Sequence, residues 1–401
     1  MKLGRALAGP RLTVVTPGPE RTYVALETVT PTIPTSLTRI VEEPCAHEAA
    51  IASVSHICHW VRAVSTPEPI HVWNLKGAWV FGGRIHGRTD IGHDDGQLVL
   101  TRRFGLITPS WGIMDGNRTL PRNLVPQPGS DRSRLRWPDH RRGLGGALRR
   151  ASRRPERRLR GTYFLLGSEH GHFGHVMLEG LSRLWALASL KDELDQGMRF
   201  LIYEDSIPDW AHDLLERAGV QRDRIVFASE VDFVEHLIVA EPAMRTHRWI
   251  TTGMAEVWQR IGDSVAPGNS TRVYLTRANM RNRGLANEDR VAELFREAGF
   301  RVVAPETLPV EEQIALARGA DVLAGPVGSQ MYLAAFQKPG AQTVVFAPAN
   351  FYLKDDVLIA SALDHELDVR FGTEVPLESR KVDWTWEIGL DLVEDVIRSS
   401  R

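Results

Sequence analysis

The stretch Asp321–Phe336 (DVLAGPVGSQMYLAAF) constrains the fold of this chain most. Asp321–Ala324 predicts the end of a short buried strand, Gly325–Gly328 a turn, and Gln330–Phe336 a helix with Ser329 as its N-cap. Such a junction directs free backbone N–H groups and the positive end of a helix dipole at one point. That arrangement suits a phosphate or the diphosphate of a nucleotide sugar. Gly-Pro turns also precede helices that bind nothing, so the interpretation depends on other stretches.

The composition describes an ordinary globular chain. Its 401 residues, 43% of them hydrophobic, favour two domains with a core in each. A formal net charge of -1 argues against a nucleic-acid partner, and two cysteines are too few for a disulfide framework and fit a cytoplasmic protein. The N-terminus has no sustained apolar core, and no apolar run approaches the ~18 residues of a membrane helix. We expect a soluble protein that is at most peripheral to a membrane.

Short strands and helices alternate from residue 161 onward, which predicts an α/β fold built on parallel, doubly wound sheets. The segment Ser264–Asn269 is a linker between two such units. Residues 1–70 are rich in proline, and His71–Phe104 alternates as in a small all-β subdomain. The predicted domains are therefore a β-rich region over 1–160, a first lobe over 161–265, a second lobe over 266–380 and a C-terminal segment over 381–401. Its helix, over Trp386–Ser399, is free to return to the first lobe.

Twelve arginines lie between Arg132 and Arg160. They fit either an acidic acceptor, a membrane surface or nucleic acid, or a solvated insertion between subdomains. Nucleic acid is disfavoured because Trp137 is the one aromatic residue available for base stacking in this run.

The first lobe carries the histidine-rich stretch Glu169–Arg183. His175 and Glu179 are spaced i,i+4, so they share a face of the predicted helix Val176–Leu190, next to the end of a strand. A glutamate on an apolar helix face is costly unless it is paired or functional. Glu179 is thus a candidate general base, with His175 as its orienting partner or as the base itself. The structural alternative is a Glu179–Arg183 salt bridge, since Arg183 is also i+4.

His172 and Arg183 are candidates for contacts on the acceptor side. The three histidines of HGHFGH, with His170 as the first, also leave a metal site open.

The second lobe supplies candidates for a diphosphate. Arg277, Arg281 and Arg283 follow a predicted strand, and the planar guanidinium can bond two phosphate oxygens at once. Asn287 either contacts a base or ribose or caps the helix that begins at Glu288. The remaining candidates belong to the turn and its helix: Gly325, Gly328 and Ser329 through their backbone N–H groups, and Gln330 through its side chain.

Three stretches in this order resemble glycosyltransferase family 61, a family that includes bacterial capsular-polysaccharide, plant xylan and eukaryotic O-linked sugar transferases. They are GHFGHVMLEGLSRLWAL (Gly171–Leu187), VYLTRANMRNRGLANEDRV (Val273–Val291) and EEQIALARGADVLAGPVGSQMYLAAF (Glu311–Phe336). The resemblance covers roughly residues 160–365, and Arg277 and Arg283 match its arginine pattern. It implies a GT-B architecture, in which two Rossmann-like lobes enclose a crevice, and an inverting sugar transfer that needs no metal ion and no cofactor. The donor would be a nucleotide sugar, UDP-linked, and the acceptor a hydroxyl of a glycan, protein or small molecule.

Two positions depart from the family pattern. Val327 replaces a histidine of the Gly-Pro turn, and Val345 replaces a glutamate of the following strand. The sequence therefore leaves a second hypothesis open, a non-catalytic nucleotide- or glycan-binding protein that kept the fold and lost the donor contacts.

Overall fold

The computed structural model describes residues 157–400 except 168–169, 203, 205, 230–231, 241, 248, 280–283, 349–350, 352 and 376–384. Before residue 157 it describes the backbone of strands only. These are β1 (Arg11–Thr13), β2 (Tyr23–Ala25), β3 (Glu27–Thr28), β4 (Ile33–Pro44), β5 (His59–Ile70), β6 (Val72–Gly82), β7 (Phe104–Ile107) and β8 (Ile113–Met114). Most of the arginine-rich run thus lies outside the described residues. The chain forms two compact units, one of Met1–Pro34 and Pro69–Ala243 and one of Thr35–Glu68 and Met244–Arg401.

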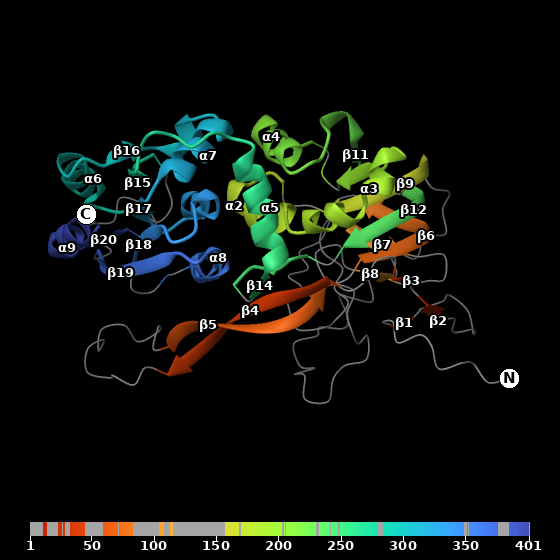
Figure 1. Cartoon of the computed structure of the whole chain (residues 1–401), viewed down its shortest axis with the longest axis horizontal. Coiled ribbons are helices and arrows are strands. Elements are labelled where there is room, and N and C mark those ends of the chain that lie inside the picture. Colours follow the sequence, from red (N-terminus) through yellow and green to blue (C-terminus); the bar gives the residue numbers. More distant parts are fainter. Residues whose placement is uncertain are drawn as a thin grey trace. The chain divides into compact units, whose positions relative to one another are not determined.

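The first unit contains a mixed sheet in the order β11-β10-β9-β12-β6-β7-β8 (Figure 1). Its parallel part consists of β9 (Arg157–Gly167), β10 (Arg199–Ile202), β11 (Ile225–Phe227) and β12 (Asp232–Ala240). β6, which the sequence assigned to a separate all-β subdomain, instead runs antiparallel along β12 in this sheet. The pairing joins strands about 160 residues apart along the chain, so no local pattern could predict it.

The chain between these parallel strands forms helices. They are α3 (Lys191–Asp195), α4 (Asp209–Arg217) and a short 3-10 turn η4 (Arg222–Arg224). The predicted helix Val176–Leu190 is wrong as a regular α-helix. The chain forms α2 (Phe173–His175), one π-helical turn η2 (Val176–Gly180) and a 3-10 helix η3 (Leu184–Ser189).

The second unit contains a six-stranded sheet in the order β16-β15-β17-β18-β19-β20. Its strands are β15 (Arg272–Leu275), β16 (Arg301–Val303), β17 (Val322–Pro326), β18 (Gln342–Pro348), β19 (Glu366–Glu374) and β20 (Trp386–Glu387). All are parallel to their neighbours except β20, which pairs antiparallel with β19. A smaller sheet joins β13 (Met244–Arg245) and β14 (Trp249–Thr251) to β4 and β5. The prediction of parallel sheets in an α/β protein is confirmed. That the two lobes form a GT-B crevice stays a prediction.

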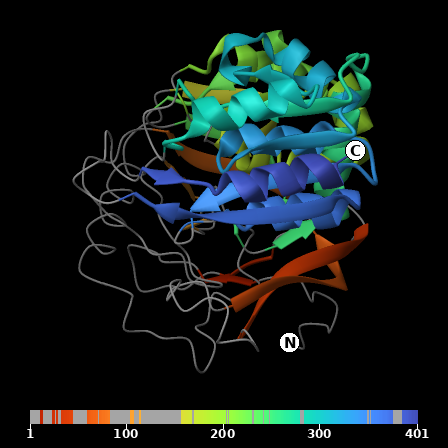
Figure 2. The same cartoon turned by 90° about the vertical axis from the view of Figure 1, so that its left-hand side faces the viewer.

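Helices lie on both faces of the six-stranded sheet, as a doubly wound unit requires (Figure 1, Figure 2). One face carries α6 (Glu288–Glu297) and α9 (Leu390–Ser399). The opposite face carries α5 (Thr252–Asp263), α7 (Val310–Gly319), α8 (Asp355–Leu363) and the 3-10 helix η6 (Ser329–Phe336), with a short 3-10 turn η5 (Pro305–Thr307) after β16.

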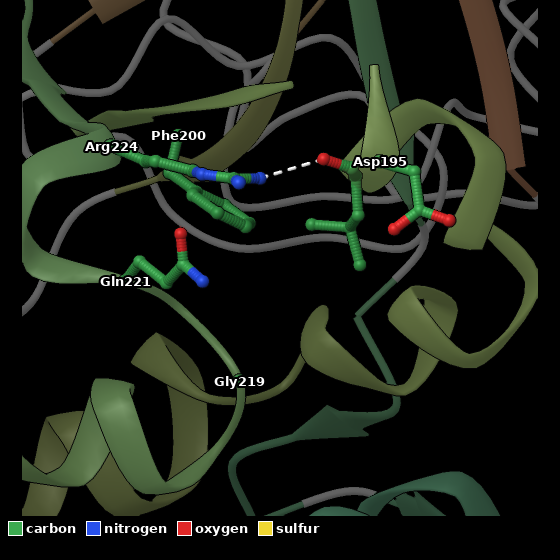
Figure 3. A pocket seen from close by; sticks show the side chains of 6 residues that line it. Asp195, Phe200, Gly219, Gln221 and Arg224 are labelled. Atoms are coloured by element: carbon green, nitrogen blue, oxygen red, sulfur yellow. Dashed lines mark hydrogen bonds between the residues drawn. The ribbon is translucent and has the colours of Figure 1, made fainter. Parts of the chain in front are cut away.

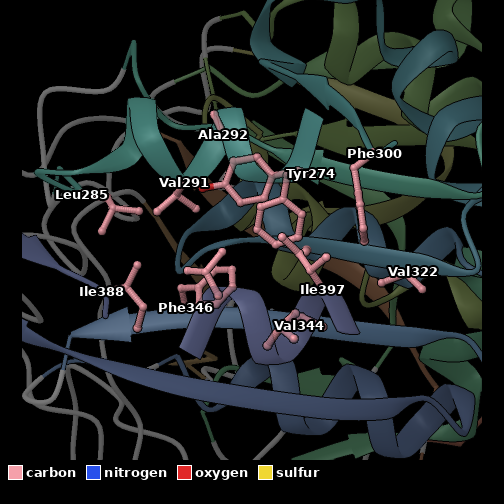
Figure 4. Close-up of a cluster of buried hydrophobic side chains, with 14 of the residues drawn as sticks. Tyr274, Leu285, Val291, Ala292, Phe300, Val322, Val344, Phe346, Ile388 and Ile397 are labelled. Atoms are coloured by element: carbon pink, nitrogen blue, oxygen red, sulfur yellow. The ribbon is translucent and has the colours of Figure 1, made fainter. Parts of the chain in front are cut away.

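The core under α6 and α9 is built from alternate residues of the strands. Tyr274, Ala324 and Phe346 point to this side, and Tyr274 stacks on Phe295 of α6 at 4.5 Å between ring centroids (Figure 4). Alternation places Leu323 and Val345 on the other side, under η6 and its neighbours. Both sides of the central strands β15, β17 and β18 are therefore buried, which explains their continuous apolar runs in the sequence.

The compact units divide the chain differently from the predicted domains. Helix α5, placed by the sequence in the first lobe, packs on η6 and α8 in the second unit. The final helix, α9, belongs to the second unit, where it packs on α6. It begins at Leu390 rather than Trp386, since Trp386 and Glu387 form β20.

No helix in the described part of the chain is long and apolar enough to cross a membrane.

Candidate functional site

The carboxyl ends of β9 and β10 bring His170 and Glu204 together. The Glu204 carboxylate accepts the backbone N–H of His170 at 2.9 Å and its ring Nδ1–H at 2.7 Å. The ring of His170 is fully buried, and its Nε2 has no hydrogen-bond partner among the described residues. This double contact fixes the loop that leads into the histidine-rich segment. The pair joins residues 34 apart, and the sequence did not predict it.

The next turn holds the predicted pair His175 and Glu179. Nδ1 of His175 lies 2.6 Å from Oε2 of Glu179, so the prediction that they share a face is confirmed. Their side chains are 50% and 37% exposed. His172 is exposed beside them, with its ring centroid 5.1 Å from that of His175. An imidazole and a carboxylate in direct contact at the edge of the sheet can exchange a proton with a bound hydroxyl. The catalytic role itself stays a prediction.

A π-helical turn presents this pair. Leu181 N–H donates to Val176 O, five residues earlier, at 3.0 Å. Gly180 ends the turn against His170: a Cβ built at Gly180 would lie 3.2 Å from the His170 ring. The glycine therefore lets the buried ring pack on the backbone. Isolated π turns within helices occur frequently at functional sites.

Arg183 is buried beside the end of β12. Only 3% of the residue is exposed, and its Nη1 donates to the carbonyl of Ala240 at the end of β12. This contact holds the end of β12 against the helical segment, and a contact of Arg183 with an acceptor stays a prediction.

In the second unit, the carboxyl ends of β15 and β17 bring Arg277 and Gln330 together. Nη1 of Arg277 donates to Oε1 of Gln330 at 2.7 Å, and Gln330 Nε2 donates to the carbonyl of Pro326. Both residues are at least 90% buried. A Cβ built at Gly328 would lie 1.9 Å from Nη1 of Arg277, so only glycine permits this approach of backbone to guanidinium.

The predicted turn Gly325–Gly328 is shorter in the structure. β17 continues through Pro326, and Gly325 pairs with Val345 of β18. Gly328 rather than Ser329 is the N-cap residue, and η6 begins at Ser329 as a 3-10 helix. The strand extends because Gly325 packs tightly: a Cβ there would lie 2.7 Å from the carbonyl oxygen of Leu275.

Glu288 organises the loop after β15, a role that the sequence did not predict. Its Oε1 accepts the hydroxyl of Thr276 at 2.6 Å and the backbone N–H of Arg277 at 2.5 Å. Burial raises the pKa of the Glu288 carboxyl, while these two hydrogen bonds oppose the rise. Glu288 thus fixes the backbone that carries Arg277.

The side chain of Asn287 binds the chain at Ile388, and its predicted contact with a base or ribose stays a prediction. Its Nδ2 donates to the carbonyl of Ile388 at 2.7 Å, and no side-chain hydrogen bond caps α6. The amide oxygen of Asn287 also accepts the N–H of Ile388. Asn287 is the N-cap residue of α6 by position, but its amide binds Ile388, the residue after β20, and does not cap the helix. Arg281 and Arg283 lie outside the described residues.

A small cavity lies elsewhere in the first unit, at the amino ends of the strands (Figure 3). It measures about 140 Å³ and lies between Phe200, near the start of β10, and Gln221–Arg224, which precede β11. Arg224 closes one side by donating to the carbonyl of Leu194 at 2.7 Å. Ligands of open α/β sheets bind at the carboxyl ends of strands, so we do not assign the function to this cavity.

Among the described residues, no group of three histidine, cysteine or acidic side chains is arranged to hold a metal ion. Within HGHFGH, the Nδ1 of His170 is occupied by Glu204, away from the exposed His172 and His175.

Comparison with protein families gives a match over the α/β part of the chain. Residues 173–345 match the family model described as Glycosyltransferase 61. The matched segment runs from the start of α2 to the middle of β18, and it includes the His175–Glu179 and Arg277–Gln330 pairs. A search of curated proteins found no match. The family predicted from the three sequence stretches is confirmed.

Proposed function

Because residues 173–345 form a glycosyltransferase family 61 domain, this chain is a glycosyltransferase, and we propose that it transfers a sugar from a UDP-linked donor to a hydroxyl group with inversion and without a metal ion. The acceptor is a glycan, a protein or a small molecule. The observation that carries the proposal is the His175–Glu179 pair, which is half-exposed, in direct contact and at the carboxyl edge of the first sheet.

The reaction is a single displacement at the anomeric carbon. The acceptor oxygen forms the new bond, the bond to the phosphate oxygen breaks with its electron pair, and the acceptor proton passes to a base. Glu179 is the proposed base, and His175 orients it. The 2.6 Å contact between them supports a shared proton-accepting unit, since a positioned base must lie within hydrogen-bonding reach of its partner.

The diphosphate of the donor needs positive charge and N–H donors. Arg277 is the described residue best suited to this role, because Gln330 and the loop held by Glu288 fix its position before any ligand arrives. Gly328 and Ser329 present backbone beside it at the start of η6. We assign the donor to the second unit on this ground.

A binding protein without transferase activity is the second candidate, and a specific observation favours it. Val327 and Val345, which replace polar residues of the family pattern, are 1% and 0% exposed and offer no polar group. The turn and β18 therefore lack two polar side chains on the donor unit.

The deciding experiment measures sugar transfer and nucleotide release by the purified protein over a panel of nucleotide sugars. We expect turnover with at least one UDP-sugar, and a loss of about 10²–10⁴-fold in kcat for Glu179→Gln. Glu216→Gln, a change to an exposed glutamate on α4, is the matched control. Binding without turnover by the wild-type protein would favour the second candidate, and full activity of Glu179→Gln would remove the assignment of the base.

A further inference from the structure

A second histidine–carboxylate pair lies in the second unit, outside the Arg277–Gln330 cluster. Asp355, the first residue of α8, holds His247 in the turn between β13 and β14. One carboxylate oxygen accepts the backbone N–H of His247 at 2.6 Å, and the other lies 2.7 Å from its ring Nδ1. The same carboxylate accepts the hydroxyl of Tyr332 at 3.3 Å. Asp355 is fully buried, whereas 48% of the His247 side chain is exposed.

This geometry determines what the exposed part of the ring can do. Nδ1 carries the proton of its contact with Asp355, because a carboxylate can only accept hydrogen bonds. In the neutral ring Nε2 is then the acceptor, with a lone pair directed away from Asp355. The complementary ligand group is a hydrogen-bond donor such as a hydroxyl.

The backbone of His247 is also unusual. Its φ of 61° lies in the left-handed region, which among the described non-glycine residues is shared only with Asp364. Asp364 follows the last turn of α8, where this conformation is common. A hairpin turn that needs such a residue is best served by glycine or asparagine. A histidine held there by two contacts to a buried carboxylate indicates that the ring itself has a use.

The surrounding charge excludes a phosphate as the ligand of His247. Asp355 is followed by Asp356, which is 4% exposed, and burial and the neighbouring charge of Asp355 raise the pKa of Asp356 well above its usual value. Asp356 therefore keeps its proton, and the negative charge behind His247 is that of Asp355, which repels an anion and tolerates a neutral hydroxyl.

The pair lies at the same edge of the sheet as the proposed donor residues. Asp355 begins α8 after the carboxyl end of β18, and its partner Tyr332 lies on η6, the helix that carries Gln330.

We propose that Nε2 of His247, oriented by Asp355, binds a hydroxyl of the ribose or of the sugar of the nucleotide-sugar donor. This inference rests on the proposed function, in which the second unit binds the donor.

Two substitutions test the proposal because each places an amide group near a different nitrogen of the ring. His247→Asn places an amide near Nδ1, suits a left-handed backbone and removes the acceptor at Nε2. His247→Gln extends an amide oxygen toward the position of Nε2 and gives up the Nδ1 contact. We expect His247→Asn to raise the Kd for a hydroxyl-bearing ligand by about 5–10-fold and His247→Gln by less than about 3-fold.

Three probes, titrated by calorimetry, identify the hydroxyl. Inorganic pyrophosphate carries no carbon-bound hydroxyl, UDP adds the ribose, and UDP-glucose adds a sugar. Weaker binding of both UDP and UDP-glucose to His247→Asn assigns the ribose, and weaker binding of UDP-glucose alone assigns the sugar. Pyrophosphate should bind wild-type and variant equally. His236→Asn, a change to a half-buried histidine of the first unit, is the control, and thermal melting confirms that each variant is folded.

The outcomes separate the two proposals. If the wild-type protein binds UDP or UDP-glucose and His247→Asn binds equally well, the inference is wrong and the proposed function stands. The reverse order, in which His247→Gln binds worse than His247→Asn, would show that the contact to Asp355 matters only for structure, and would also overturn the inference. Equal weakening for all three probes, or a fall in kcat with no change in KM, likewise overturns it. If the wild-type protein binds none of the three, the donor assignment and the inference fail together.

Discussion

The two units each hold a histidine in contact with a carboxylate, but in different surroundings. His175 and Glu179 are one helical turn apart and half-exposed, so solvent screens their attraction. His247 and Asp355 are 108 residues apart, and the carboxylate is fully buried. The first pair is close in the sequence and free to rearrange around a ligand. The second depends on the folded second unit and is fixed in advance. The same two chemical groups therefore contribute differently to stability, and the predictions below test that difference.

The largest expected effect is on the buried pair. Asp355→Ala leaves the N–H of His247 and the hydroxyl of Tyr332 without their acceptor, so we expect the free energy of unfolding to fall by about 3 kcal/mol. Glu179→Ala should lower it by less than about 1 kcal/mol. Denaturant melts of the two variants measure both values. Equal losses would show that burial does not distinguish the pairs.

His365, a half-buried histidine with no ion pair among the described residues, sharpens the comparison. Burial lowers the pKa of His365 from 6.5 to about 4, with smaller opposing effects from backbone groups and Asp364. Between these values the unfolded chain binds a proton that the folded chain does not. The free energy of unfolding is therefore highest above pH 6.5, and it decreases as the pH falls from 6.5 to about 4. We expect this loss to reach about 2 kcal/mol and to shrink in His365→Gln.

The measurement for His365 is chemical denaturation at a series of pH values from 7.5 to 4.5. His236→Gln serves as the control, because the loss should persist in it. An unchanged pH dependence in His365→Gln would contradict the prediction.

Asp356 gives the opposite dependence of stability on pH. Burial raises its pKa well above 3.8, so the folded chain keeps a proton that the unfolded chain releases as the pH rises. The wild-type protein therefore loses stability above about pH 3.8, and an asparagine, which does not ionise, avoids that loss. We expect Asp356→Asn to raise the free energy of unfolding by about 1 kcal/mol at pH 7 and to have little effect near pH 4. Thermal melts at both values check this, and a decrease at pH 7 would contradict it.

The smallest expected effect concerns the support of the exposed pair. Gly180→Ala places a methyl group 3.2 Å from the ring of His170, which must move by a few tenths of an ångström. We expect a loss of about 1 kcal/mol or less. Because η2 carries Glu179, we expect the variant to bind an acceptor analogue with a higher Kd. Its melting temperature should stay close to that of the wild-type protein. Gly171→Ala, where a Cβ meets no atom within 4 Å, is the matched control.

Local patterns predicted well what depends on neighbours in sequence. The i,i+4 contact of His175 and Glu179, the strands around Arg272–Leu275 and Val322–Ala324, and the helix Asp355–Leu363 all follow from spacing and apolar runs. The α/β class followed from their alternation.

Contacts between distant residues were not predictable from the same patterns. His170 with Glu204 and His247 with Asp355 join segments that are far apart in the sequence, and nothing in the residues next to either histidine indicates its partner. Glu288 looked like an ordinary first-turn acid of α6, yet its carboxylate bonds the loop before it. The π turn at Val176–Gly180 depends on the packing of Gly180 against His170, so helical periodicity could not show it.

The route of the chain has a practical consequence. Strands β4 and β5 belong to the second unit, although residues on either side of Thr35–Glu68 belong to the first. A fragment that starts at Met244 would expose the backbone edge of β14 that β4 now covers, and uncovered strand edges pair with other molecules. Separate expression of the second unit therefore needs Thr35–Glu68 supplied with it, either fused or co-expressed.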